Sequence, residues 1–212
     1  MDPLITVLLA MSAIAWTIVY VCSIVLGFRE KTYCIPLWAL GLNICWEVIY
    51  ACAGVSNPQL QNVANAVWAC CDILIVVTYF KYGRAFLPKR IQPYFIPYSV
   101  IVFASCLVFQ LAFFLQFDDQ VISGQFSAFA QNAIMSVLFV GMLIRRGSSK
   151  GQSMVIAVAK CLGTLAPTIQ HGLLQGFNIY VLCMGAFVLV WDVIYIVLLH
   201  RQIKQERQRS LP

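Results

Sequence analysis

The stretch Trp46-Glu47-Val48-Ile49-Tyr50 places a carboxyl group in the middle of a long apolar run. The pattern returns near the other end of the chain as Trp191-Asp192-Val193-Ile194-Tyr195, again within an apolar run. Burying such an acid in hydrocarbon costs about 2.5–3.5 kcal/mol on insertion scales, so an acid found there is a functional-site candidate by default. We therefore interpret the rest of the chain as the scaffold that holds Glu47 and Asp192.

The composition indicates a membrane protein. The chain has 212 residues, of which 61% are apolar and 10% charged, and apolar runs follow one another along it. Runs of about 20 apolar residues are long enough to cross a bilayer as helices, which excludes a soluble core. We predict an all-α polytopic fold, with one domain of seven transmembrane helices over residues 1–212. The predicted spans cover residues 4–27, 33–55, 63–80, 95–117, 125–144, 154–173 and 176–200, followed by a basic cytosolic tail at 201–212.

Two prolines and the cysteines add local detail to the predicted helical fold. Pro36 falls in the first turn of the second predicted span, where a missing N–H does no harm. Pro167 predicts a kink in the sixth span that frees the carbonyl of Gly163 to face a cavity. The nine cysteines all lie within apolar runs and have no zinc-ligand spacing. We expect them to be free packing residues.

The basic residues predict the orientation of the chain. They follow the first, third, fifth and seventh spans, at Arg29, Lys31, Lys81, Arg84, Lys89, Arg90, Arg145, Arg146, Lys150, Arg201, Lys204, Arg207 and Arg209. The opposite segments carry Asp2, the uncharged Ser56-Asn57-Pro58, the pair Asp118-Asp119 and His171. By the positive-inside rule the amino terminus is external or lumenal and the carboxyl terminus cytosolic. The net charge of +6 is then mainly a topology signal. We expect no nucleic-acid partner, because the basic residues form no stripe with stacking aromatic residues.

Four ionisable side chains lie well inside the predicted spans: Glu47, Asp72, Lys160 and Asp192. Lys160 is near the cytosolic start of its span, so we expect its ammonium group to reach back to the headgroups. Asp72 is at the middle of the third span, one helical turn after Trp68 and on the same face. We expect Asp72 to have an auxiliary role, positioning Trp68 or a neighbouring acid.

Helical spacing surrounds the other two acids with polar and aromatic groups. Asn43, Glu47 and Tyr50 share one face of the second span, and Asp192 shares a face with Tyr195. An aromatic pair four residues apart, Trp46 with Tyr50 and Trp191 with Tyr195, adjoins each acid. A purely structural role remains open, because intramembrane acids also bond across helices to polar groups. Such groups are present at Asn43, Gln131, Asn132, Thr164, Thr168 and Gln170.

The motifs Asn43-x-x-Trp46-Glu47-x-x-Tyr50 and Trp191-Asp192-x-x-Tyr195 resemble those of the small integral-membrane terpene cyclases. This paxilline-type family acts in fungal meroterpenoid and indole-diterpene biosynthesis and has relatives in bacterial indole-terpenoid pathways. The resemblance covers the whole chain in length, span count and placement of both acids. It implies that Glu47 and Asp192 are essential for protonation-initiated cyclisation. It also implies that the protein is located in the endoplasmic reticulum membrane if its source is a fungus, or in the plasma membrane if its source is a bacterium.

The chemistry of such a reaction suits these residues. A prenylated substrate partitions into the bilayer, and cyclisation begins when a proton reaches an epoxide oxygen or an alkene. A carboxyl group in a dry apolar pocket favours its neutral form at pH 7 and can donate. The resulting cation can be stabilised by aromatic faces, each worth up to ~2 kcal/mol when dry. The candidate rings are those of Trp46, Tyr50, Trp68, Trp191 and Tyr195, with Asn43 and Asp72 in support.

Other mechanisms and functions make different demands on the sequence. Asp118-Asp119 lacks the further acids of a magnesium cluster, so we expect a reaction without metal or cofactor. The substrate would come from an upstream prenyltransferase, and from an epoxidase if it carries an epoxide. The alternative function is a proton-coupled transporter. Acids near the membrane midplane, in a motif that recurs in a second span of opposite direction, are also typical of transporters.

Overall fold

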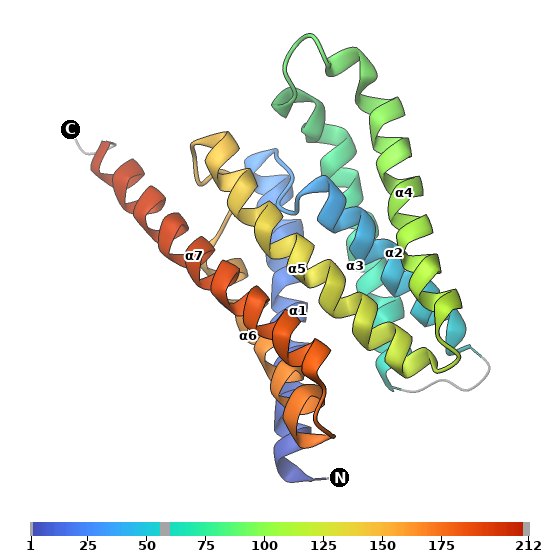
Figure 1. The fold of residues 1–212 in the computed structure, drawn as a ribbon. Helices are drawn as coiled ribbons and strands as arrows, with labels where there is room; N and C mark the ends of the chain where they lie inside the picture. Colours follow the sequence, from blue (N-terminus) through green and yellow to red (C-terminus); the bar gives the residue numbers. More distant parts are fainter. Residues whose placement is uncertain (1, 56–59, 210–212) are drawn as a thin grey trace. The chain divides into compact units, whose positions relative to one another are not determined.

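The computed structural model describes residues 2–55 and 60–209, and within them the chain forms seven α-helices and no β-strand (Figure 1). The predicted all-α class and helix number are confirmed. The predicted outer loop at 56–58 lies outside the described residues. The helices are α1 (Pro3–Glu30), α2 (Leu37–Ala53), α3 (Leu60–Tyr82), α4 (Phe95–Gln116), α5 (Gln120–Arg146), α6 (Met154–Ile169) and α7 (Ile179–Arg209). Two 3₁₀ turns (Gly83–Phe86 and Gln92–Tyr94) and one π-helical turn, η3 (Gln170–Leu174), complete the described elements.

Five helical segments of the described chain are long and apolar enough to cross a membrane. They comprise α1, α3 with the turn after it, α4 with the turn before it, α5 and α7. The apolar α2 has 17 residues and α6 has 16, the latter continued by η3. This arrangement is that of a polytopic membrane protein.

The helix bounds differ from the predicted spans at several ends, and a local reason is clear for the second helix. The second helix begins at Leu37 rather than at residue 33, because Pro36 has an extended ψ of 141° and stands as the N-cap. A proline also disfavours helical geometry in the residue before it, here Ile35. At the other end, α7 continues as helix through Arg209, so the described part of the predicted 201–212 tail is helical.

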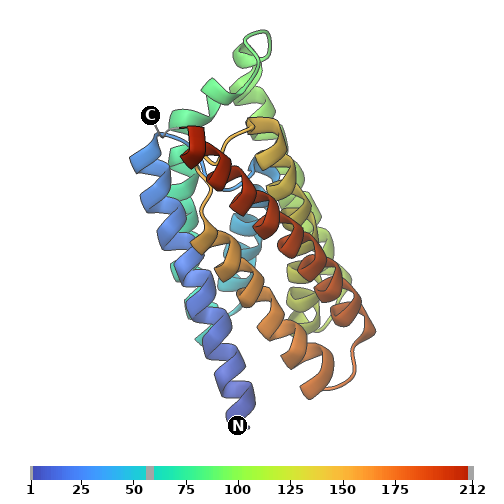
Figure 2. The same cartoon turned by 90° about the vertical axis from the view of Figure 1, so that its left-hand side faces the viewer.

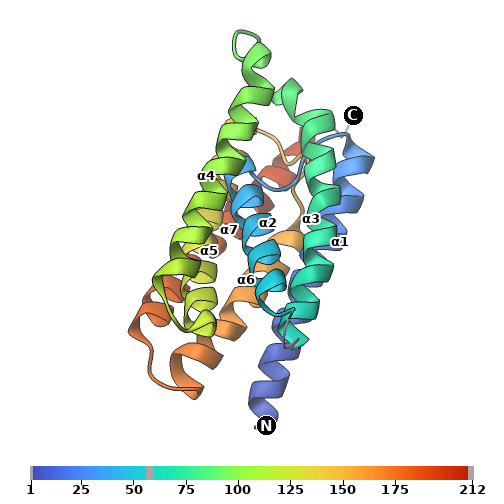
Figure 3. The same cartoon turned by 90° about the vertical axis from the view of Figure 1, so that its right-hand side faces the viewer.

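The chain divides into two compact units. The central unit comprises residues 23–131, and in it α2 packs against both α3 and α4, between which it lies in Figure 3. The terminal unit comprises residues 1–22 and 132–212, and in it α6 and α7 lie side by side (Figure 2). The single domain over residues 1–212 stays a prediction.

Pro167 lies inside α6, as the sequence predicts, but the carbonyl that it frees has other partners. The oxygen of Gly163 accepts hydrogen bonds from Ser12 Oγ at 2.8 Å and from Trp16 Nε1 at 3.2 Å. A Cβ atom at Gly163 would lie 3.0 Å from the Trp16 ring, so glycine is what permits this close approach of α1. The expectation that this carbonyl faces a cavity is therefore wrong, because two side chains of α1 satisfy it.

Candidate functional site

The central unit holds two buried acids joined by one amide. Asn43 Nδ2 donates to Glu47 Oε1 at 3.2 Å, one turn along α2, and to Asp72 Oδ2 at 2.9 Å on α3. Glu47 is 1% exposed and Asp72 0%. Asn43 and Glu47, which helical spacing places on one face, are thus hydrogen-bonded to each other. Asp72 joins the same cluster through Asn43, and its auxiliary role stays a prediction.

Further amides determine which way Asn43 points. Asn43 Oδ1 accepts from Gln131 Nε2 at 3.4 Å, and Gln131 Oε1 accepts from Gln110 Nε2 at 2.7 Å. Gln110 Nε2 also donates to the carbonyl of Leu42 at 3.2 Å, which orients its amide. Since an amide has distinct donor and acceptor ends, this series directs the NH₂ group of Asn43 toward the two acids.

Glu47 Oε1 and Asp72 Oδ2 both accept from Asn43 Nδ2, so the two carboxyl groups lie at one site. Two carboxyl groups at one site repel each other when both are charged. The cluster of Asn43, Glu47 and Asp72 therefore favours a proton on one of its two buried acids.

Aromatic rings adjoin this cluster as the spacing predicts. The rings of Trp46 and Tyr50 have their centroids 4.9 Å apart. Trp46 Nε1 donates to the carbonyl of Gly124 at 3.1 Å, and the Tyr50 hydroxyl lies 2.6 Å from Ser123 Oγ. Both rings are thus anchored on α5. Trp68 lies half-buried on α3, one turn before Asp72.

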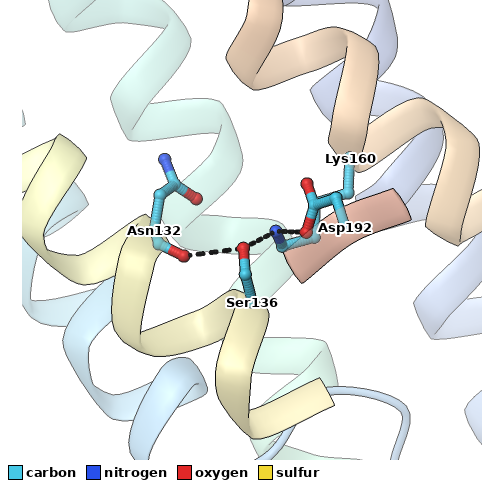
Figure 4. Close-up of polar contacts among 4 residues, drawn as sticks. All are labelled: Asn132, Ser136, Lys160 and Asp192. Carbon is cyan, nitrogen blue, oxygen red and sulfur yellow. Dashed lines mark hydrogen bonds and ion pairs between the residues drawn. The ribbon is translucent and has the colours of Figure 1, made fainter. Parts of the chain in front are cut away.

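The terminal unit holds the other acid as an ion pair (Figure 4). Lys160 Nζ, on α6, lies 2.7 Å from Asp192 Oδ1 on α7, and each residue is 1% exposed. Lys160 Nζ also donates to Ser136 Oγ on α5 at 2.6 Å. Ser136 Oγ in turn donates to the carbonyl of Asn132 at 2.9 Å, which leaves its lone pairs for the ammonium group.

The expectation that Lys160 reaches back to the headgroups is wrong. Its ammonium group is buried because α7 brings the opposite charge of Asp192 against it and α5 supplies a hydroxyl acceptor. The contact joins residues 32 positions apart, so helical spacing along one span could not show it. The sequence nonetheless contained a signal for this ion pair, because a lysine and an acid that lie well inside consecutive spans can neutralise each other's charge.

The aromatic neighbours of Asp192 are placed differently from each other. The Tyr195 hydroxyl donates to Gln152 Oε1 at 3.1 Å, and its ring centroid lies 5.3 Å from that of Phe139. Trp191 is half-buried, with its ring 6.1 Å from Phe187. Tyr195 is therefore a packed and anchored ring, whereas Trp191 keeps part of its surface accessible.

Among residues 2–55 and 60–209, no group of three or more His, Cys, Asp or Glu side chains is placed to hold a metal ion. The described residues therefore identify no metal centre. That the reaction needs neither metal nor cofactor stays a prediction.

Comparison with known proteins places this arrangement in a family. Residues 1–206 match the family described as Pyr4-like transmembrane terpene cyclases. The Pyr4-family terpene cyclase mfmH of Annulohypoxylon moriforme is 29% identical over 163 residues, which are 74% of this chain and 66% of that protein. The terpene cyclase andB of Emericella variicolor is 26% identical over 185 residues, 84% of this chain and 75% of that protein. Asnovolin H synthase nvfL of Aspergillus novofumigatus is 28% identical over 170 residues, 76% and 68% of the two chains.

No solved structure matches the chain significantly. The family match covers nearly the whole sequence and agrees with the apolar helices and the buried acids described above. The resemblance inferred from the two acidic motifs is confirmed. The chain belongs to the Pyr4-like transmembrane terpene cyclases.

Proposed function

We propose that this membrane protein cyclises an apolar prenylated substrate by protonating it, and that Glu47 supplies the proton. The observation that carries the proposal is the buried cluster of Asn43, Glu47 and Asp72, in which two carboxyl groups accept hydrogen bonds from one amide. Family membership supports the reaction class, since the relatives above are named terpene cyclases or a synthase. A dry carboxylic acid suits the first step because no water competes for its proton.

The first step moves one proton and one electron pair. The Glu47 O–H bond breaks, and the proton passes to an epoxide oxygen or to a terminal alkene carbon of the substrate. Opening the epoxide C–O bond, or using the alkene π electrons for the new C–H bond, leaves a carbocation, which a neighbouring alkene attacks to form the ring. Asn43 assists because its NH₂ group hydrogen-bonds the Glu47 carboxylate that remains.

The carbocation needs a surrounding that stabilises it without reacting with it. Aromatic faces do this through cation–π attraction. We assign that role to Trp46, Trp68 and Trp191, which keep accessible surface, and to Tyr50 and Tyr195, whose hydroxyls are already hydrogen-bonded to the protein. Because these hydroxyls are engaged, they are less free to attack the cation as nucleophiles.

Asp192 is the second residue that we assign to proton transfer. Its carboxyl group is buried on α7 and paired with Lys160, so its environment differs from that of Glu47. The substrate itself must be made elsewhere: a prenyltransferase reaction must supply it, and an epoxidation must precede cyclisation if the epoxide is the group protonated.

The alternative of a proton-coupled transporter predicts a different result in one experiment. Detergent-solubilised protein is incubated with a panel of prenylated phenols and indoles, each with and without a terminal epoxide. Products are separated by chromatography, and their mass is checked by mass spectrometry. A cyclase converts at least one compound to an isomer of unchanged mass without a sealed compartment. If no compound in the panel is consumed, the proposed function is wrong.

We also propose the orientation with the amino terminus external or lumenal and the carboxyl terminus cytosolic. The support is the distribution of Lys and Arg, which gather at the carboxyl-terminal ends of α1, α3, α5 and α7 and on the segments that follow the first three of these helices. By the positive-inside rule these segments face the cytosol.

A further inference from the structure

We propose that Lys160 is a positioning residue that keeps Asp192 ionised, so that Asp192 ends the cyclisation as its base and does not begin it as an acid. The proposal rests on the proposed function above and assigns the second acid within it. It concerns contacts inside the terminal unit alone.

The two acid clusters differ in their charge balance. Glu47 and Asp72 accept from one neutral amide, so the repulsion between their two charges favours a proton on one of them. Asp192 instead faces the ammonium group of Lys160 at 2.7 Å, and the two opposite charges cancel. The ion pair is complete without any further proton, so Asp192 has none to give.

The ammonium group is fixed by a second contact. Ser136 Oγ donates to the carbonyl of Asn132 and therefore offers its lone pairs to Lys160 Nζ at 2.6 Å. With Ser136 on α5 and Asp192 on α7, the ammonium group of α6 is held between two acceptors. A lysine held between these two acceptors stays beside one oxygen of the Asp192 carboxylate, Oδ1.

The other oxygen of Asp192 is the one left to react. Asp192 Oδ2 is buried and has no hydrogen-bond partner among the residues that the structure describes. A buried acceptor without a partner is costly, and such atoms in native structures call for an explanation. An open carboxylate oxygen in a dry surrounding is suited to accept a proton from carbon.

The terminating step balances as follows. A C–H bond next to the cationic carbon breaks, its electron pair forms the new C=C bond, and the proton passes to Asp192 Oδ2. The substrate gains one proton in the first step and loses one in the last, so the product is an isomer of the substrate. Before the next cycle Asp192 returns its proton to solvent and the Glu47 cluster regains one.

Product pattern distinguishes this role from a structural one. Without its base the cation still forms, but it is captured by water as an alcohol or loses a different hydrogen to give an isomeric alkene. A residue that only maintained the fold would, when replaced, lower every product together. The ratio of products therefore reports on Lys160 independently of protein yield.

The test uses the panel substrate that the wild-type protein consumes. Lys160→Arg keeps the charge and should retain the wild-type product. Lys160→Gln keeps hydrogen bonding without charge, and Lys160→Met keeps neither. In both variants the share of wild-type product should fall at least about tenfold. This is a smaller effect than complete loss of a general base commonly has on a rate. The matched control is Thr164→Val, one turn further along α6, at a buried hydroxyl that has no hydrogen-bond partner in the described chain.

A neutral double variant keeps the test decisive if a single change leaves an unpaired buried charge. Lys160→Met with Asp192→Asn removes both charges, and replacing a buried ion pair by neutral residues is often harmless to stability. It should consume substrate and give the altered products. A wild-type product pattern from Lys160→Met, or from the double variant, overturns the inference. Glu47→Gln run alongside separates the two proposals, because unchanged consumption there refutes the proposed acid whatever the Lys160 variants do.

Discussion

The side-chain amide of Asn43 lies 2.9 Å from the carboxylate oxygen Oδ2 of Asp72, across the contact between α2 and α3. The same nitrogen donates to Glu47, so one NH₂ group joins two acids that lie 25 positions apart in the sequence, on different helices. Two charged carboxylates at one site repel each other, which favours a proton on one of them. This relationship makes the two carboxyl groups experimentally separable, because only one of them needs to donate.

Replacing the proposed donor should abolish the reaction. Glu47→Gln keeps size and hydrogen bonding but removes the acidic proton, so we expect kcat to fall by roughly 10²–10⁴-fold. The measurement is product formation by solubilised protein at saturating substrate. Asp118→Asn, at an exposed acid outside the helices, is the control and should leave kcat unchanged. A rate near that of the wild type in purified Glu47→Gln protein would show that another group is the acid.

Replacing Asp72 should be milder. Asp72→Asn still offers Asn43 a hydrogen-bonding partner in the same place, so some activity should survive, with kcat reduced by less than about 10²-fold, the low end for losing a general acid. The comparison is kcat beside Glu47→Gln in protein that elutes from size exclusion as the wild type does. Complete loss in such protein would give Asp72 a chemical role in place of the auxiliary one.

Packing of α6 on α7 should depend on Gly185. A Cβ atom there would lie 2.2 Å from Thr168 Cγ2, and Thr168 cannot turn away freely because its hydroxyl donates to the carbonyl of Thr164 at 2.7 Å. We expect Gly185→Ala to lower stability by about 1–3 kcal/mol through overpacking. The readout is the thermal midpoint in detergent.

The control for this change is Gly141→Ala. A Cβ atom at Gly141 meets nothing within 4 Å, so the added methyl group has room. Its thermal midpoint should equal or slightly exceed that of the wild type, since alanine is the better helix former. Equal midpoints for the two variants would contradict the packing argument.

Reporter fusions test the orientation. A reporter after Pro212 should be cytosolic and one inserted within residues 56–59 should be external or lumenal, because the basic residues place the carboxyl-terminal end inside. Accessibility to a membrane-impermeant reagent provides the measurement. Both reporters on one side would contradict an arrangement with seven crossings.

Local properties of the sequence were enough for the class of protein and the positions of its acids. Apolar runs of spanning length predict helices wherever they occur, because a helix satisfies its backbone hydrogen bonds within the segment. Helical spacing likewise placed Asn43 beside Glu47, and Trp46 beside Tyr50, since residues four apart meet on one face. The two acidic motifs pointed to the family, which the match over residues 1–206 confirms.

Only the tertiary structure decided which partner each buried group has. Asn43 with Asp72, Lys160 with Asp192, and the carbonyl of Gly163 with α1 are all contacts between helices. Spacing along one helix carries no information about which face of another helix it meets. A buried polar group accepts any neighbour of suitable charge and geometry, so its partner is set by how helices distant in sequence pack together.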